Sequence, residues 1–195
     1  MLSSDYILGF VEGEGCFNVS IAKYVNYRAR ETGRKSLRKS KAFPFVVKPS
    51  FRVVCVERDR AVLESIKEAI GVGNIYINHR KDSVKHQDMA HYYVQTFADL
   101  VTVREFFEKH VFMTTKGEDF KRWCKCLDII LSGKHKTKEG FLELCGLREQ
   151  MNVHTGKSTM WKPEEIAKVF EENEDIETGS SQETQKLIHN NISTI

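Results

Sequence analysis

Two glutamates at the end of an apolar segment have a spacing that points to metal chemistry. Residues 6–15 read YILGFVEGEG, in which Glu12 and Glu14 alternate with Gly13 and Gly15. The helix dipole disfavours carboxylates at a helix C-terminus, so a positive group should compensate this pair. Carboxylate oxygens and the unsatisfied last carbonyls of a helix are hard ligands that suit Mg²⁺. The motif therefore predicts that the helix ends on metal ions.

The same segment predicts a symmetric helix pair. Gly9 and Gly13 are four residues apart and share one helical face, where small residues let two backbones approach closely. Glycine costs about 1 kcal/mol inside a helix, so a chance placement is a weak explanation. The chain contains one such segment, so the simplest partner is a second copy, which would bring two Glu14 carboxylates around a shared cation. We therefore expect a homodimer with Tyr6, Gly9, Phe10 and Gly13 at its interface.

Hydrophobic periodicity predicts an α+β domain that positions this motif. The expected elements are a helix from Ser3 or Ser4 to about Gly13, strands 16–23 and 43–56, a helix 58–70, strands 75–80 and 91–97, helices 98–110, 119–131 and 137–151, and a short helix from 162. The order α-β-β-α-β-β-α with extra C-terminal helices indicates an antiparallel sheet with one polar face. We expect a core over 1–152, a helical extension over 153–173 and a disordered acidic tail over 174–195.

The polar face of the predicted sheet is strongly basic, although the net charge is only +3. In residues 20–60 many lysines and arginines stand against Glu31, Glu57 and Asp59, whereas residues 171–183 contain acids and no base. Basic blocks commonly meet phosphate backbones, and a solvated charged loop is the alternative. A two-stranded ribbon fits the DNA major groove, where Arg, Asn and Gln read base edges. The side chains expected to face double-stranded DNA are Asn18, Ser20, Lys23, Asn26, Arg28, Arg30, Arg34, Lys35, Arg38, Lys39, Lys41, Lys48, Ser50, Arg52, Tyr76, Asn78, Arg80, Lys81, His91, Tyr93 and Gln95.

Composition sets limits on compartment and class. Hydrophobic residues at 41% and charged residues at 29% are typical of a globular protein. The 5 cysteines contain no CxxC pair, which favours a reducing intracellular compartment, an organelle matrix or a prokaryotic cytoplasm, over a disulfide framework or zinc site. No apolar run has the length of a membrane span, and no signal peptide precedes the first helix, so we expect no membrane partner.

Three stretches together resemble one known family. GFVEGEG after a capped apolar helix resembles the motif of LAGLIDADG homing endonucleases, and so do FRVVCVERDRAVLESIKEAIGVGNIYI at 51–77 and TTKGEDFKRW at 114–123. The similarity covers roughly residues 3–131, about two-thirds of the chain. It implies a homodimer of single-motif chains with a β-saddle that binds a long, nearly palindromic DNA site and cuts both strands, as in intron homing.

The resemblance also assigns roles to particular residues. The motif's final acid falls on Glu14, which with the carbonyl of Gly13 would hold the catalytic Mg²⁺. Mn²⁺ is expected to substitute, and Ca²⁺ to bind without supporting cleavage. Lys116 matches the basic residue near the scissile phosphate. Cys55 departs from the family pattern, because it aligns with a glutamine that often positions water or metal, and a thiol replaces an amide poorly.

Two functions remain open from the sequence. One is a Mg²⁺-dependent, site-specific DNA endonuclease, and the other is a non-cleaving binding protein on the same scaffold, either an RNA intron maturase or a DNA-binding regulator. The acid at position 14 after a glycine favours the enzyme, whereas Cys55 leaves room for the binding protein. An open reading frame inside an intron would support homing or maturation, and a free-standing gene would support regulation.

Overall fold

The computed structural model describes residues 2–23, 43, 45–79, 87–151 and 163–171, which form an α+β fold around one antiparallel sheet. The elements are α1 (Ser4–Glu14), β1 (Gly15–Lys23), β2 (Phe45–Val56), the 3-10 turn η1 (Glu57–Asp59), α3 (Arg60–Ile70), β3 (Asn74–Asn78), β4 (Met89–Val94), α4 (Phe97–Phe107), α5 (Lys116–Leu131), the 3-10 turn η2 (Lys134–Lys136), α6 (Lys138–Glu149) and α7 (Pro163–Glu171). The expected α-β-β-α-β-β-α order with additional helices is confirmed.

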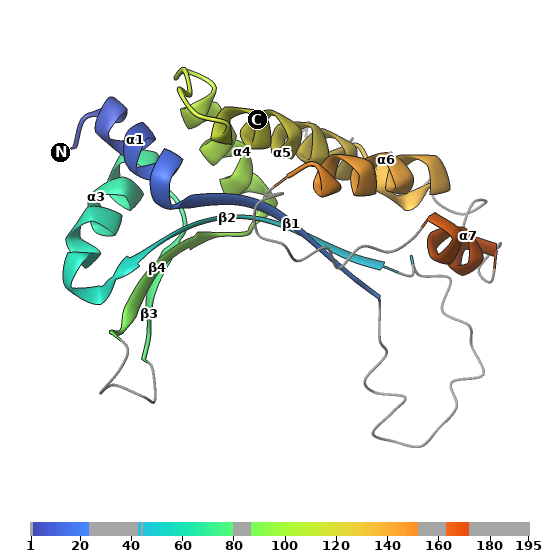
Figure 1. Cartoon of the computed structure of the whole chain (residues 1–195), viewed down its shortest axis with the longest axis horizontal. Helices are drawn as coiled ribbons and strands as arrows, with labels where there is room; N and C mark the ends of the chain where they lie inside the picture. Colours follow the sequence, from blue (N-terminus) through green and yellow to red (C-terminus); the bar gives the residue numbers. More distant parts are fainter. Residues whose placement is uncertain (1, 24–42, 44, 80–86, 152–162, 172–195) are drawn as a thin grey trace, which may run out of the picture.

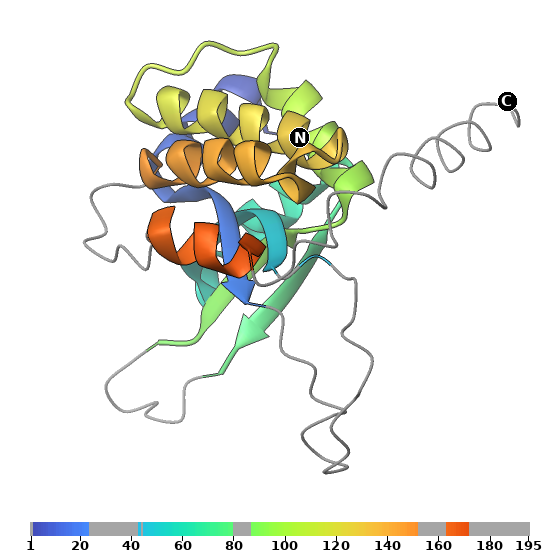
Figure 2. The same ribbon diagram turned by 90° about the vertical axis from the view of Figure 1, so that its right-hand side faces the viewer.

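One face of the sheet is covered by helices. The strand order is β1-β2-β4-β3, and the helices gather on the convex side in Figure 1. In the turned view of Figure 2, α5, α6 and α7 lie one below another beside the strands. The register pairs Phe17 with Phe51 and Phe51 with Val94, which keeps the apolar side chains of three strands on one face. Because strand side chains alternate, the polar residues fall on the concave side, over which Figure 1 draws no described helix.

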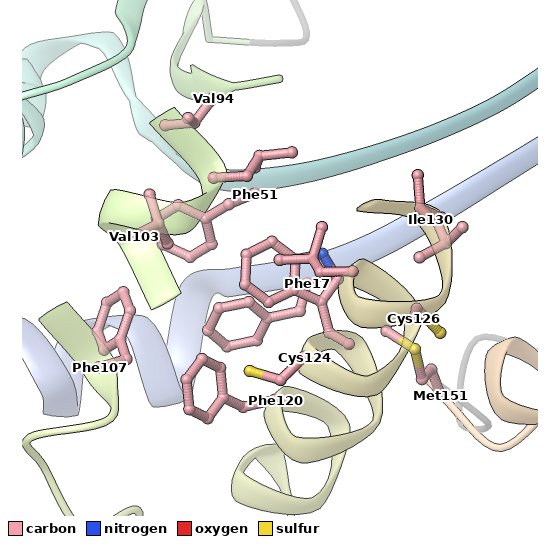
Figure 3. Close-up of a cluster of buried hydrophobic side chains, with 14 of the residues drawn as sticks. Phe17, Phe51, Val94, Val103, Phe107, Phe120, Cys124, Cys126, Ile130 and Met151 are labelled. Carbon is pink, nitrogen blue, oxygen red and sulfur yellow. The ribbon is translucent and has the colours of Figure 1, made fainter. Parts of the chain in front are cut away.

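The core is built around the ring of Phe17, which is fully buried. Its centroid lies 5.1 Å from that of Phe51 on β2, and 5.1 Å and 5.2 Å from those of Phe120 and Trp123 on α5. Phe107 of α4 meets it edge-on at 5.8 Å. Figure 3 shows the rings of Phe17, Phe51, Phe107 and Phe120 packed between the strands and the helices. The core therefore fixes β1, and with it the end of α1, against α5.

Replacing Phe17 by alanine should lower the free energy of unfolding by about 3 to 5 kcal/mol, because it removes a ring from the centre of this cluster. Phe97→Ala is the matched control, since the ring of Phe97 is 46% exposed and its removal should cost far less. Urea denaturation at one fixed protein concentration would measure both. Equal losses would contradict this description of the core.

A second aromatic cluster attaches α7 to the sheet. Phe45 of β2 stacks on Phe141 of α6 with centroids 4.3 Å apart, and Phe170 of α7 lies 6.0 Å from Phe141. Ile166 and Val169 of α7 are also buried. The described helix of the expected 153–173 extension thus packs on the core over 1–152, while the predicted tail over 174–195 lies outside the described residues.

Two helix boundaries differ from expectation around the turn between α4 and α5. Helix α4 ends at Phe107 and not at 110. Just beyond this end, the ring Nδ1 of His110 donates a hydrogen bond to the carbonyl of Phe106. Helix α5 begins at Lys116, three residues before the expected start at 119. Its first turn contains Gly117, whose backbone lies so close to Phe112 that an added Cβ would be 2.7 Å from the Phe112 Cβ. The earlier start makes Lys116 the first residue of a helix.

Candidate active site and nucleic-acid interface

The C-terminus of α1 runs directly into β1. The helix begins after Ser3, whose hydroxyl accepts the N–H of Tyr6 at 3.2 Å. It ends at Glu14 because Gly15 adopts an extended conformation, with φ −78° and ψ 152°, while its N–H bonds the Val11 carbonyl. A Cβ on Gly15 would lie 2.6 Å from Val11 atoms, so only glycine fits. The motif therefore places Glu12 and Glu14 at the junction of helix and sheet.

Glu12 contacts the turn before α5. One oxygen of its carboxylate accepts the backbone N–H groups of Met113 and Thr114, each at 2.7 Å. Partial burial acts to raise the pKa of Glu12, but the hydrogen bonds from Thr114 and Met113 and the charge of Lys116 outweigh it and hold the pKa below its usual value. The local pattern around Glu12 does not predict this partner, because the turn lies about a hundred residues further along the chain.

Lys116 reaches the same helix end. Its ammonium donates a hydrogen bond to the backbone carbonyl of Gly15, the residue that follows Glu14. The side chain of Glu14 is exposed. The structure thus places Lys116 at the helix end that carries Gly13 and Glu14, the other two residues predicted to act in catalysis. The Lys116 ammonium therefore supplies part of the positive charge that was expected beside this helix end.

Cys55 lies on β2 in the electrostatic surroundings of this site. Its thiol is half-buried, and burial, followed by the charges of Asp59 and Glu14, raises its pKa. A thiol that stays protonated is a weak donor and a weak acceptor, unlike the glutamine amide that the family resemblance leads us to expect at this position. The structure therefore keeps Cys55 near Glu14 and in a neutral form.

The cysteines should differ in their reaction with iodoacetamide. Burial raises the pKa of Cys124 and Cys126 to about 12 and that of Cys145 to about 11. Alkylation needs the exposed thiolate, so these three should stay unmodified in the native protein between pH 7 and 9, whereas half-buried Cys55 should react faster as pH rises. Mass spectrometry of tryptic peptides would follow each site. Modification of Cys126 at the rate of Cys55 would contradict this ordering.

One face of α1 has no cover from the described part of the chain. An added Cβ on Gly9 or Gly13 would meet no atom within 4 Å, and both residues are exposed. Tyr6 is 49% exposed and stacks beside Phe10, with centroids 6.4 Å apart. The opposite side of the helix is buried in the core through Ile7, Leu8 and Val11. The four residues predicted at a dimer interface therefore form one accessible face, the glycine face (Tyr6, Gly9, Phe10 and Gly13).

The concave face of the sheet collects most of the described residues that were predicted to meet DNA. On this face lie Asn18 and Ser20 of β1, Lys48, Ser50 and Arg52 of β2, Tyr76 and Asn78 of β3, and His91 and Tyr93 of β4. Exposed Gln95 follows β4. Lys48 and Arg52 are exposed, whereas Ser50 between them is buried, with only 5% of its surface exposed. The open face is thus polar and carries cations along its longest strand.

An aromatic group interrupts this polar face on β3 and β4. The rings of Tyr76 and His91 stack with centroids 5.8 Å apart, and Tyr93 meets Tyr76 edge-on at 6.1 Å. Partial burial and Tyr93 raise the pKa of the Tyr76 hydroxyl, while the charge of Arg52 opposes them. The Tyr76 hydroxyl therefore stays protonated at neutral pH and can donate a hydrogen bond.

Several predicted DNA contacts lie outside the described residues. These are Asn26, Arg28, Arg30, Arg34, Lys35, Arg38, Lys39, Lys41, Arg80 and Lys81. Lys23 ends β1, and only its backbone is described.

Comparisons with known proteins agree with this geometry. A model of the LAGLIDADG endonuclease family matches residues 7–127, more than half of the chain. The structure is similar to that of the homing endonuclease I-TnaI, with 30% identity and a TM-score of 0.63 over 88% of this chain and 98% of that one. It is also similar to the archaeal intron-encoded homing endonuclease I-Vdi141I complexed with DNA, with 25% identity and a TM-score of 0.67 over 88% and 96% of the two chains.

A third similar structure is longer than this chain. The LAGLIDADG meganuclease I-AabMI bound to uncleaved DNA is 26% identical, with a TM-score of 0.61, and the match covers 78% of this chain and 45% of that one. No curated protein matches the sequence. Within the described ranges no helix is both long and apolar enough to cross a membrane. The chain belongs to the LAGLIDADG endonuclease family.

Proposed function

We propose that this chain forms a homodimer that cuts a long, nearly palindromic double-stranded DNA site with the aid of Mg²⁺, in the manner of intron homing. The observation that carries the proposal is the position of Lys116, whose ammonium donates to the carbonyl of Gly15 at the helix end that carries Glu14. This helix end runs into the first strand of an open, polar sheet face. A phosphate held at that junction would meet both groups.

The concave face supports binding to DNA. A β-ribbon can enter the major groove, and Arg52, Asn18 and Asn78 are of the types that read base edges there. Lys48 adds an exposed cation that suits a phosphate. The similar structures of I-Vdi141I and I-AabMI contain DNA, which agrees with this use of the face.

Two arguments support a homodimer. The glycine face leaves room for another helix to approach closely, since an added Cβ on Gly9 or Gly13 meets no atom within 4 Å. The chain corresponds to nearly all of I-TnaI but to 45% of I-AabMI, which leaves room in the longer chain for a second unit of this size. Two copies joined through α1 would supply one site for each DNA strand.

The donor atoms of the helix end fit Mg²⁺ only in part. Glu14 offers an exposed carboxylate and Gly13 a carbonyl, which are hard oxygen ligands. Among the described residues of one protomer, no three His, Cys, Asp or Glu side chains gather as a metal site. Mg²⁺ commonly keeps waters and binds one or two carboxylates together with substrate phosphates. The fit therefore requires the second protomer's Glu14 and the DNA.

The chain's own residues have separate tasks in hydrolysis. Bound Mg²⁺ would supply an activated water and neutralise charge at the phosphate. Glu14 and the carbonyl of Gly13 would hold the ion at the helix end. Lys116 would stabilise the negative charge that develops on the phosphate in the transition state. The sheet face would orient the DNA so that the scissile bond reaches these groups.

A selection experiment tests the proposal. Purified protein would be incubated with a randomised double-stranded DNA pool in Mg²⁺, Mn²⁺ or Ca²⁺, and the bound and cut molecules sequenced. We expect staggered cuts within one nearly palindromic site in Mg²⁺ and Mn²⁺, and binding of the same site without cutting in Ca²⁺. Random cutting, or cutting that needs no divalent metal, would refute the proposal.

One observation favours a second candidate, a non-cleaving binding protein. The thiol of Cys55, with its raised pKa, stands within the electrostatic influence of Glu14, at a position where the family resemblance leads us to expect a glutamine amide. Selective DNA binding without cutting in any metal would support a DNA-binding regulator. Absence of DNA selection together with binding to intron RNA would support a maturase.

A further inference from the structure

We propose that Glu12 is a positioning residue, which holds Lys116 beside Glu14 and thereby sets the rate of strand cleavage without touching DNA. The inference rests on the proposed nuclease function. Its basis is the pair of hydrogen bonds that the Glu12 carboxylate accepts from Met113 and Thr114, just ahead of Lys116.

The turn bonded to Glu12 is the start of the helix that carries Lys116. The hydroxyl of Thr114 accepts the backbone N–H of Lys116 at 3.3 Å, and the carbonyl of Thr114 accepts that of Gly117 at 3.1 Å. A shift of Thr114 would therefore move the first turn of α5. Glu12 fixes this residue from α1, the helix that ends at Glu14.

Side-chain packing does little to hold this turn. Met113 is 84% exposed and Val111 is 78% exposed. Phe112 is the anchor on one side, because its ring meets Phe17 of the core at 6.2 Å. Between Phe112 and Lys116, the Glu12 carboxylate is the contact that ties the described turn to α1. The position of the Lys116 backbone thus depends on a polar contact that can be removed without opening the core.

Two contacts join the junction of α1 and β1 to the start of α5 and the turn before it, and they lie on either side of Glu14 in the sequence. Glu12 bonds the turn, and the carbonyl of Gly15 accepts the Lys116 ammonium. A lysine side chain has a flexible four-carbon stem, so the second contact alone leaves its base free to shift. The Glu12 carboxylate, by contrast, accepts two successive backbone N–H groups at 2.7 Å each, so it fixes the backbone of the turn directly.

A double-mutant cycle would test whether Glu12 acts through Lys116. Glu12→Ala should slow cleavage of the selected DNA site about 10- to 100-fold, because small displacements of a catalytic group have effects of this size. DNA affinity measured in Ca²⁺ should not change. Glu12→Gln keeps an oxygen that can accept both N–H groups and should recover most of the loss. In a Lys116→Met background, Glu12→Ala should slow cleavage no further. Glu143→Ala, at an exposed site on α6, is the control.

Amide hydrogen exchange separates this inference from the nuclease proposal. The amides of Met113 and Thr114 should lose protection in Glu12→Ala and keep it in Glu12→Gln. If the parent cuts no DNA, the nuclease proposal fails while this exchange pattern still supports the tether. Unchanged protection in Glu12→Ala would overturn the inference. Equal rate losses from Glu12→Ala in the parent and Lys116→Met backgrounds would also overturn it.

Discussion

Cleavage of the selected DNA site should slow at least about 10³-fold when Glu14 is replaced by glutamine. The substitution keeps the size and shape of the side chain but removes its negative charge, which is the property needed to hold a divalent cation. Because Glu14 is exposed, the fold should not change. Single-turnover cleavage of the selected site in Mg²⁺ would measure the loss, and affinity for the same DNA without divalent metal should be retained.

A matched control separates the charge of Glu14 from a general effect of charge. Glu143 is an exposed glutamate on α6, and Glu143→Gln should leave the cleavage rate near that of the parent. Lys116→Met should also slow cleavage, by about 10²-fold, since it removes one stabilising group and leaves the metal site in place. Full cleavage by Glu14→Gln would refute the assignment of the metal site to the end of α1.

Dimerisation should weaken at least about 10²-fold when Gly9 is replaced by leucine, while the folded protomer gains helix stability. Within the chain an added Cβ at Gly9 meets no atom within 4 Å, so the protomer has room for the side chain. Leucine is also the better helix former by nearly 1 kcal/mol. In a dimer joined through the glycine face, each leucine would separate the two helices, and symmetry introduces the clash twice. Analytical ultracentrifugation across a concentration series would measure the dissociation constant.

Another helical glycine provides the control for Gly9. An added Cβ on Gly146 of α6 also meets nothing within 4 Å. Gly146→Leu should show the same gain in helix stability with no change in dimerisation. Cleavage by Gly9→Leu should fall with the dimer, because both strands are cut only when two sites are present. A dimer that survives Gly9→Leu would place the interface elsewhere.

Much of the fold is determined by patterns among residues that are close in the sequence, and it is therefore predictable from the sequence. Phe17 and Val19 alternate with Asn18 and Ser20, and this period of two both defines β1 and decides which face meets the helices. The serine before α1 and the glycine after it mark the two ends of that helix. The order of elements, the open polar face and the exposed glycine face follow from such patterns, because each depends on residues a few positions apart.

Contacts between distant segments were decided by the tertiary structure. The pattern at 12–15 identified Glu12 as a carboxylate in need of a positive partner, but the N–H groups of Met113 and Thr114 that meet it come from a turn about a hundred residues later. The start of α5 at Lys116 likewise depends on the close approach of Gly117 to Phe112.

The sequence alone therefore determined the family motif, the fold class and the residues with the capacity for chemistry. Only the tertiary structure decided that Lys116 bonds the carbonyl after Glu14, that Cys55 lies within reach of the Glu14 charge, and that α7 packs on β2. The physical reason is that side-chain periodicity encodes local conformation and the buried face, whereas the pairing of remote polar groups depends on how the packed core brings their backbones together.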